Sequence, residues 1–166
     1  MSTAVCPGSF DPMTLGHVDV VRRARSMFDE VVVAVAHNST KRALLTPQER
    51  VALAEEALAD LDGVRVVATD GLLVDLVREL GAQAVVKGLR SGADLDAELA
   101  MALMNRHLSG VETVFVLGDP ALSHVASSLV KDVARHGGRI DDLVTPGVAA
   151  AVRRALGERR GGEDGR

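Results

Sequence analysis

The sequence of 166 residues lacks Trp and Tyr altogether and contains only three Phe and one Cys. Because aromatics make up 2% of the chain, a core has to be built from Val, Ala and Leu, which dominate an apolar fraction of 47%. Aliphatic cores of this kind suit buried parallel strands. The single cysteine, Cys6, excludes an internal disulfide and fits a reducing compartment.

An excess of basic residues and a long apolar run are also missing. The formal charge of -4 and the pI near 5.7 argue against broad binding to nucleic-acid phosphates, but they leave room for a local basic pocket. No stretch approaches the roughly 20 apolar residues that span a bilayer, and no basic segment followed by an apolar leader stands at the N-terminus. We therefore expect a cytoplasmic protein with no membrane partner and no nucleic-acid partner.

The chain instead alternates short β-branched runs with helical patterns. Strands are expected at residues 4–6, 31–36, 64–68, 84–86 and 113–117. The helices between them carry their own signals: an apolar face from Val20 to Phe28, a capping box at Thr46-Pro47-Gln48-Glu49, and periodic segments at 72–80, 95–107, 127–136 and 146–156. This repeated strand–helix order predicts an α/β fold, a parallel sheet with helices on both faces.

The length predicts a single domain over residues 1–157. Residues 158–166 are Gly-rich and charged, so we expect a disordered tail. In parallel sheets ligands collect at the carboxyl ends of the strands, where the strand order reverses. The loops that follow the strands are therefore the places to look for chemistry.

The loop after the first strand reads CPGSFDPMTLGH. Gly8 permits unusual backbone angles, Asp11-Pro12 favours a turn, and Gly16-His17 opens a helix whose amides and positive dipole end favour a phosphate. Taken alone, a Gly-His pair of this kind is more often a strand-to-helix loop with a surface histidine. Neither the Walker A pattern nor the G-x-G-x-x-G pattern is present, which weakens a kinase or dehydrogenase interpretation.

Three further loops carry cations or hydroxyls at the same predicted edge. Lys41 and Arg42 follow the second strand, while the fourth strand ends in Lys87-Gly88 with Arg90 close behind, a pattern that suits phosphate groups. Ser127 or Ser128 can cap the next helix, and Lys131 stands one turn later. Together these loops predict a polyphosphate site. His37, His107 and His136 lack metal-ligand spacing, so we expect no protein-held metal.

The motifs PGSFDPMTLGH, KGLR, ELAMALMNRHL and SSLVKDVARHGG occur in this order over roughly residues 3–145. The set closely resembles bacterial phosphopantetheine adenylyltransferases, and TLGH is similar to the T-x-G-H form of the nucleotidyltransferase signature. The resemblance implies a Rossmann-like doubly wound fold, a homohexamer, and possible feedback by coenzyme A. It also implies transfer of the adenylyl group of ATP, with Mg²⁺, to 4'-phosphopantetheine in coenzyme A biosynthesis.

By the same resemblance, each motif residue receives a role. His17, Lys41 and Arg90 are the expected catalytic residues, with His17 acting as a cation on the ATP phosphate and Lys41 bridging the two reacting phosphates. The ATP-binding set is Ser9, Phe10, His17, Gly88, Arg90, Glu98, Ser127 and Ser128. The phosphopantetheine-binding set is Ser9, Lys41, Leu73, Lys87 and Asn105.

The chain departs from the family pattern at aromatic and serine positions near the expected nucleotide site. Relatives commonly carry aromatics where this sequence has Leu95, Ala97 and His124, and a serine where it has Ala126. Two alternatives stay open: a related nucleotidyltransferase that uses glycerol 3-phosphate or nicotinamide mononucleotide, and a nucleotide-binding module without catalysis. The first tends to have His at the position of Thr14, and the second would be expected to lose a charged site residue.

Overall fold

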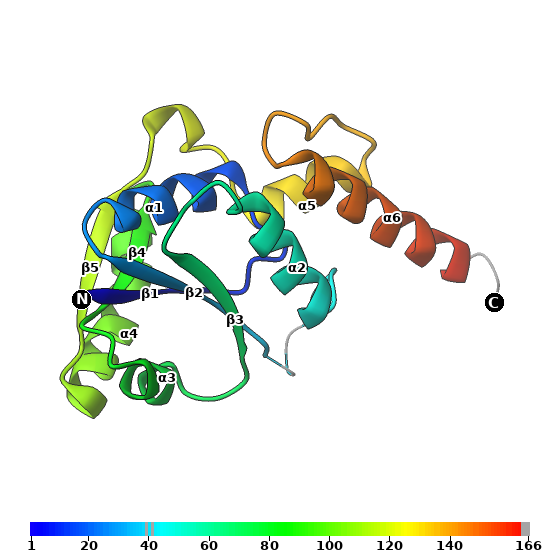
Figure 1. Cartoon of the computed structure of the whole chain (residues 1–166). Coiled ribbons are helices and arrows are strands. Elements are labelled where there is room, and N and C mark those ends of the chain that lie inside the picture. The colour runs from blue at the N-terminus through cyan, green and yellow to red at the C-terminus, as the bar shows by residue number, and fades with distance from the viewer. Residues whose placement is uncertain (39, 41, 164–166) are drawn as a thin grey trace.

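Five parallel strands form one sheet in the computed structural model, which describes residues 1–38, 40 and 42–163 (Figure 1). The strand order is β3-β2-β1-β4-β5. The strands are β1 (Thr3–Gly8), β2 (Glu30–Ala36), β3 (Val64–Thr69), β4 (Ala84–Leu89) and β5 (Glu112–Leu117). All five predicted strands are confirmed, and the order is that of a Rossmann-like doubly wound sheet.

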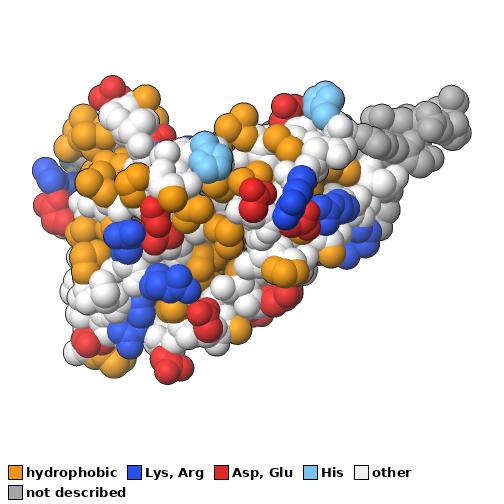
Figure 2. Space-filling model, turned by 90° about the horizontal axis from the view of Figure 1, so that it is seen from above, with side chains coloured by type: hydrophobic (Ala, Val, Ile, Leu, Met, Phe, Trp, Pro, Cys, Tyr) orange, Lys and Arg blue, Asp and Glu red, His pale blue; other side chains and the backbone are white. Residues whose placement is uncertain are grey.

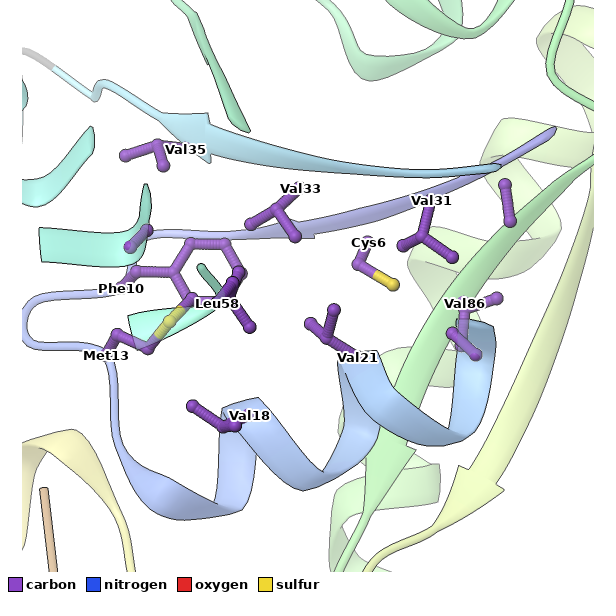
Figure 3. Packing of buried hydrophobic residues seen from close by; sticks show 13 residues of the cluster. Cys6, Phe10, Met13, Val18, Val21, Val31, Val33, Val35, Leu58 and Val86 are labelled. Atoms are coloured by element: carbon purple, nitrogen blue, oxygen red, sulfur yellow. The ribbon is translucent and has the colours of Figure 1, made fainter. Parts of the chain in front are cut away.

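Helices cover both faces of this sheet, as the alternating pattern predicts (Figure 1). On one face, α1 (Leu15–Arg25) and α2 (Pro47–Ala57) pack on the central strands through aliphatic side chains such as Val21 and Ala54. Figure 3 shows this core, where Val18 and Val21 of α1 point toward the sheet, Val18 on the side of Met13 and Val21 on the side of Cys6. On the other face, α3 (Leu73–Leu80) and α4 (Gly92–Ser109) lie below the strands.

A further apolar cluster lies beside the sheet rather than on it. A short 3-10 helix (Pro120–Leu122) follows β5 and leads to α5 (Ser127–Arg135), after which α6 (Pro146–Glu163) extends away from the sheet (Figure 1). Val130, Val148 and Val152 of these two helices pack with Leu44 and Leu45, the residues that precede α2. Leu44 and Leu45 thereby attach the start of α2 to the C-terminal helices.

Helix boundaries follow local capping where the signal is strong. The Thr46 box is confirmed, since the Glu49 amide donates to Thr46 Oγ1 at 3.2 Å and the Thr46 amide donates to Glu49 Oε2 at 2.8 Å. Helix α1 ends at Arg25, so the expected apolar face stops short of Met27, which is exposed. Helix α4 begins at Gly92 rather than at residue 95.

Helix α6 runs to Glu163, past the end expected at residue 156 and into the segment 158–166 for which disorder was expected. The charged composition of this segment is compatible with a helix, because Arg and Glu are good helix formers and extending an existing helix costs no new nucleation. Within the described part of the chain, no helix combines the length and the apolar character needed to cross a bilayer.

Candidate functional site

The sheet reverses its strand order between β1 and β4, and a cavity of about 570 Å³ opens at that point. We call it the switch-point cavity. Parallel sheets bind ligands at such positions, outside the carboxyl ends of the strands. It is lined by every residue of the expected ATP-binding set: Ser9, Phe10, His17, Gly88, Arg90, Glu98, Ser127 and Ser128. The structure thus brings together residues that lie up to 119 positions apart, from Ser9 to Ser128.

The β1–α1 loop makes a tight turn at the floor of this cavity. Phe10 has a φ of 48°, in the left-handed region, and its ring meets His17 edge-on with centroids 5.1 Å apart. A Cβ at Gly8 would stand only 3.0 Å from the Phe10 ring. Gly8 is therefore needed for the close approach of this ring, which in turn holds the imidazole of His17.

His17 forms a capping box with Thr14 at the start of α1. The Thr14 amide donates to His17 Nδ1 at 3.0 Å, and the His17 amide donates to Thr14 Oγ1 at 3.4 Å. Because Nδ1 accepts a backbone hydrogen bond, the neutral ring carries its proton on Nε2. The T-x-G-H spacing thus places a preoriented N–H donor in the first turn of the helix.

The charge state of His17 in the free protein is set by its surroundings. Removal of the imidazole from water, followed by the positive charges of Arg90 and Lys87, lowers the pKa of His17 to about 4. At neutral pH the ring is uncharged before substrate binds. His17 is therefore a neutral hydrogen-bond donor in the free protein, and the cation expected on the ATP phosphate stays a prediction for the ATP-bound state.

The two cations of the β4 loop each face a carboxylate of α4. Lys87 Nζ lies 3.2 Å from Glu98 Oε1, and Arg90 Nε lies 3.5 Å from Asp94 Oδ2, which also accepts from the Arg90 amide at 2.7 Å. Arg90 Nη1 donates to the carbonyl of Val125 at 3.0 Å, which joins the loop to the segment before α5. The cations are thus held in place by groups that a phosphate could replace.

Gly88 lies between these cations. Helix packing explains why a glycine is needed at this position. A Cβ at Gly88 would collide with the side chain of Val20 on α1. The glycine permits helix and strand to come close together, which brings His17 of α1 toward the β4 loop.

The start of α5 differs from the expected serine cap. The N-cap residue is Ala126 and makes no side-chain cap. Ser127 Oγ donates to the carbonyl of Pro12 at 2.8 Å instead, because the β1–α1 loop lies against this helix end. Ser127 and Ser128 still line the cavity, where the helix N-terminus favours an anion.

Two buried charged residues escape the sequence-based candidate list. Asp11 accepts from the amides of Leu44 and Leu45, each at 2.9 Å, and from Lys131 Nζ at 3.0 Å. Burial alone would raise the pKa of Asp11, but the two amides and Lys131 outweigh it and hold that pKa below its ordinary value. Arg50 Nη1 donates to the carbonyl of Ser9 at 2.7 Å and of Ala36 at 2.9 Å.

A sequence signal for Arg50 exists in hindsight. Arg50 stands four residues before Ala54 and eight before Leu58, on the face of α2 that is buried against the sheet. A charged residue on a buried helix face requires polar partners. Asp11 offers no comparable pattern, because its partners come from distant segments.

A second depression adjoins the first along α3 and α4. We call it the α3–α4 groove; its walls are largely apolar, and it holds the expected channel residues Leu73 and Asn105. Ser9, Lys87 and Glu98 line both depressions, so the groove opens directly onto the cation site. Among the expected phosphopantetheine residues, only Lys41 lies outside the described part of the chain.

The four family departures divide into two groups. Ala97 and Ala126 line the switch-point cavity, whereas Leu95 and His124 are exposed residues that line neither depression. The described residues contain no group of three or more His, Cys, Asp or Glu side chains placed to hold a metal ion. Cys6 lies under the cavity, where burial raises the pKa of its thiol to about 12 despite a small opposing effect of Lys87, so it is not a nucleophile.

Comparisons with known proteins agree with this architecture. A family model described as cytidylyltransferase-like matches residues 5–133. A phosphopantetheine adenylyltransferase of Nocardioides sp. is 51% identical over 156 residues, covering 94% of this chain and 98% of the relative. Another, from Bifidobacterium animalis subsp. lactis, is 51% identical over 158 residues, covering 94% of this chain and 99% of the relative.

Solved structures show the same fold at lower identity. A Vibrio parahaemolyticus protein assigned as a nicotinate-nucleotide adenylyltransferase superposes with a TM-score of 0.66 at 18% identity, covering 94% of this chain and 95% of that one. A lipopolysaccharide core biosynthesis protein of Thermoplasma volcanium gives 0.53 at 24% identity, covering 72% of this chain and 97% of that one. By sequence and by fold, the chain belongs to the phosphopantetheine adenylyltransferase family of cytidylyltransferase-like proteins.

Proposed function

We propose that this protein transfers the adenylyl group of ATP to 4'-phosphopantetheine, giving dephospho-coenzyme A and pyrophosphate. The observation that carries the proposal is the meeting of two unlike depressions at Ser9, Lys87 and Glu98. One depression gathers cations and helix N-termini, as a polyphosphate requires. The other is an apolar groove, as a long, uncharged acceptor arm requires. An acceptor with its phosphate at the junction and its arm in the groove fits both.

The reaction needs positioning more than covalent catalysis. A phosphate oxygen of the acceptor forms a bond to the α-phosphorus of ATP, the bond between that phosphorus and the oxygen bridging to the β-phosphorus breaks, and pyrophosphate leaves with the electron pair. Both reactants are anions, so their approach has to be offset by positive charge and hydrogen-bond donors. His17 supplies a preoriented Nε2–H, Arg90 supplies charge at the ATP phosphates, and Lys87 supplies charge at the acceptor phosphate.

Lys41 completes this arrangement in the proposal by bridging the acceptor phosphate and the α-phosphate. Its described neighbours Asn38 and Arg42 line the switch-point cavity, which supports this role. Ser9 holds the acceptor phosphate with Lys87. Ser127, Ser128 and the start of α5 hold the distal phosphates of ATP, while Phe10, Gly88 and Glu98 line the rest of the nucleotide site.

The carboxylates of Glu98 and Asp94 act as internal counter-ions before substrate binds. Their ion pairs, Lys87–Glu98 at 3.2 Å and Arg90–Asp94 at 3.5 Å, keep the two cations extended toward the cavity. An arriving phosphate replaces these weak, partly exposed pairs, so the cations need no large rearrangement to bind it. Glu98 is then released to contact ATP.

Mg²⁺ would enter this site with ATP, held mainly by phosphate oxygens. Two carboxylates of the cavity are already engaged: Asp11 by two amides and Lys131, and Asp19 by the Asp119 amide at 2.8 Å and Arg23 at 2.9 Å. The remaining carboxylates suit a cation that keeps several waters and binds one protein oxygen at most. Bound there, Mg²⁺ would neutralise charge on the leaving pyrophosphate.

We further propose a cytoplasmic homohexamer that coenzyme A can inhibit. Helix α4 supports assembly, because it carries exposed apolar side chains that a monomer would leave in water: Leu95, Leu99, Met101, Leu103, Met104 and Leu108. The reduced, buried Cys6 supports a cytoplasmic location. Coenzyme A shares its pantetheine arm with the acceptor, so the α3–α4 groove supports competition between them.

The proposal is tested by pyrophosphate release from ATP with 4'-phosphopantetheine, run beside glycerol 3-phosphate and nicotinamide mononucleotide. Of the three acceptors, we expect only 4'-phosphopantetheine to give pyrophosphate release. Release with another acceptor would keep the switch-point cavity as the catalytic site but replace the acceptor. ATP binding without release from any of the three would instead favour a nucleotide-binding module without catalysis.

A further inference from the structure

Arg50 is a buried guanidinium at the back of the switch-point cavity, with only 3% of its surface exposed. Its Nη1 donates to two backbone carbonyls, and its Nε has no hydrogen-bond partner within the described part of the chain. No carboxylate of the described residues forms an ion pair with it. A buried charge without a counter-ion is costly, so its retention calls for a role beyond packing.

The two carbonyls that Arg50 joins belong to different strand ends. Ser9 follows β1 and lies at the junction of the two depressions, whereas Ala36 is the last residue of β2. Arg50 itself comes from α2, which begins after the loop that follows β2. Through hydrogen bonds of 2.7 Å to Ser9 and 2.9 Å to Ala36, the Arg50 side chain connects α2 to the ends of β1 and β2 in the cavity wall.

The far end of that loop is tied to the same β1–α1 turn by Asp11. Its carboxylate accepts hydrogen bonds from the amides of Leu44 and Leu45, so Ala36 on one side of the loop and Leu44 and Leu45 on the other are both tied to the β1–α1 turn. Within that loop Asn38 and Arg42 line the cavity. The distance between Ser9 and these cavity-lining residues therefore depends on the two buried side chains.

We infer that Arg50 is a positioning residue for adenylyl transfer. By holding Ser9 against the end of β2, it sets the acceptor phosphate site relative to the loop that follows β2. Its uncompensated charge also lies behind a cavity that takes polyphosphate, so bound substrate supplies the missing counter-charge. This inference rests on the proposed adenylyltransferase function. Misplacement of reacting groups by about 1 Å can cost on the order of 100-fold in rate.

The chain offers a matched control for this role. Arg25 also bridges two backbone carbonyls, with Nε donating to Asp62 at 2.6 Å and Nη1 donating to Phe28 at 3.0 Å, but it lines neither depression. Arg50→Met and Arg25→Met both remove a bridging guanidinium. Only the first should change the chemistry of the site.

The test measures kcat and both KM values of pyrophosphate release, together with the thermal midpoint, for wild type and the two Met variants. We expect Arg50→Met to lose about 10- to 100-fold in kcat and Arg25→Met to stay within about twofold of wild type, with both midpoints lowered. Equal kcat in the two variants would overturn the positioning role. An inactive wild type would instead overturn the proposed function.

A conservative variant keeps the test decisive if Arg50→Met does not fold. Arg50→Lys retains the charge but cannot span two carbonyls with a planar fork. We expect the kcat of Arg50→Lys to be about tenfold below that of wild type. Where Arg50→Met is soluble, its kcat should be lower still. A folded Arg50→Lys protein with wild-type kcat and KM values would overturn the role.

Discussion

The two depressions that meet at Lys87 are built by different means. The switch-point cavity is shaped by backbone and buried polar groups. These are the Thr14–His17 capping box, the Asp11 carboxylate that binds the Leu44 amide, and the Arg50 guanidinium that binds the Ser9 carbonyl, with hydrogen-bond lengths between 2.7 and 3.4 Å. The α3–α4 groove is shaped by apolar side chains, and several of them, such as Met101 and Met104, are more than half exposed.

In the proposed function, this difference separates the groups that carry out the chemistry from those that recognise the acceptor. Hydrogen bonds with preferred directions hold donors where charge develops in the transition state, which is where precision affects the rate. Flexible side chains such as Met adapt to an apolar arm and need no fixed geometry. On the face seen in Figure 2, basic and acidic side chains are interspersed over the described residues, and neither sign gathers into a broad patch. In the switch-point cavity, by contrast, Lys87, Arg90 and Lys131 lie together.

His17→Gln should produce the largest effect, because His17 lies in the switch-point cavity, where hydrogen bonds fix the geometry. Gln at the third helical position preserves the capping-box spacing, so α1 should keep its start, but a flexible amide that cannot become charged replaces the imidazole held against Phe10. We expect kcat to fall by about 100- to 1000-fold. Steady-state pyrophosphate release measures this, with the thermal midpoint as the check on folding.

His124→Phe is the matched control for that experiment, since His124 is exposed and lines neither depression. Its kcat should stay within about twofold of wild type. A His17→Gln protein with wild-type kcat would mean that catalysis does not require the imidazole ring or its ability to carry charge.

Lys87→Gln should break the junction between the two regions. The ammonium faces Glu98 at 3.2 Å and lines both depressions, so its loss removes the charge expected at the acceptor phosphate and leaves the Glu98 carboxylate unpaired. We expect kcat/KM for phosphopantetheine to fall by about 10- to 100-fold, because a charge-assisted hydrogen bond contributes about 1.5–3 kcal/mol. KM for ATP should rise less.

Arg65→Gln provides the comparison, because it breaks an ion pair with Glu30 at 2.7 Å on the strands away from both depressions. It should leave both KM values unchanged. If Lys87→Gln also left kcat/KM unchanged, the acceptor phosphate would have to bind elsewhere.

Asn105→Leu tests the role of the α3–α4 groove. Asn105 is a buried polar residue among the apolar side chains of α4, and its amide is suited to bind a polar group of the acceptor arm. We expect KM for phosphopantetheine to rise about fivefold, the equivalent of one hydrogen bond of about 1 kcal/mol. Kinetics with each substrate varied in turn test this, and a change in KM for ATP of the same size would contradict the separation of the two regions.

Local signals in the sequence were enough to predict most of the fold. The five aliphatic runs became the five strands, and the Thr46 capping box set the start of α2, because both depend on neighbouring residues alone. The C-terminal end of α1 was missed because Met27 continues the apolar spacing although the helix ends at Arg25. The family resemblance supplied the residue sets, and the parallel sheet accounts for their meeting at one edge.

What could not be predicted depends on contacts between distant segments. Arg50 lies 41 residues from Ser9, and Lys131 lies 120 residues from Asp11, so neither contact leaves a local pattern. The neutral state of His17 likewise results from burial and from the nearby charges of Arg90 and Lys87. Ser127 or Ser128 is the cap expected from the sequence, yet the Ser127 hydroxyl donates to the carbonyl of Pro12 because the β1–α1 loop lies beside it.

The smallest predicted effect concerns stability, and it tests whether the cavity is arranged for an anion that is not yet bound. The pKa of His17 is about 4 in the folded protein against an ordinary value of 6.5, so the unfolded chain binds more protons between these pH values. Stability conferred by the neutral ring is complete above about pH 6.5 and is lost as the pH falls toward 4. The free energy of unfolding of wild type should therefore fall by about 1–2 kcal/mol more than that of His17→Gln between pH 7 and pH 5.

Urea unfolding of the two proteins at matched pH measures this difference and cancels the carboxylates that titrate in both. Added pyrophosphate should reduce it, because an anion beside Nε2 favours the protonated ring and raises the pKa of His17 toward its ordinary value. Parallel pH profiles for the two proteins would mean that the imidazole is well solvated. The switch-point cavity would then be no more strictly arranged around His17 than the groove is around its exposed methionines.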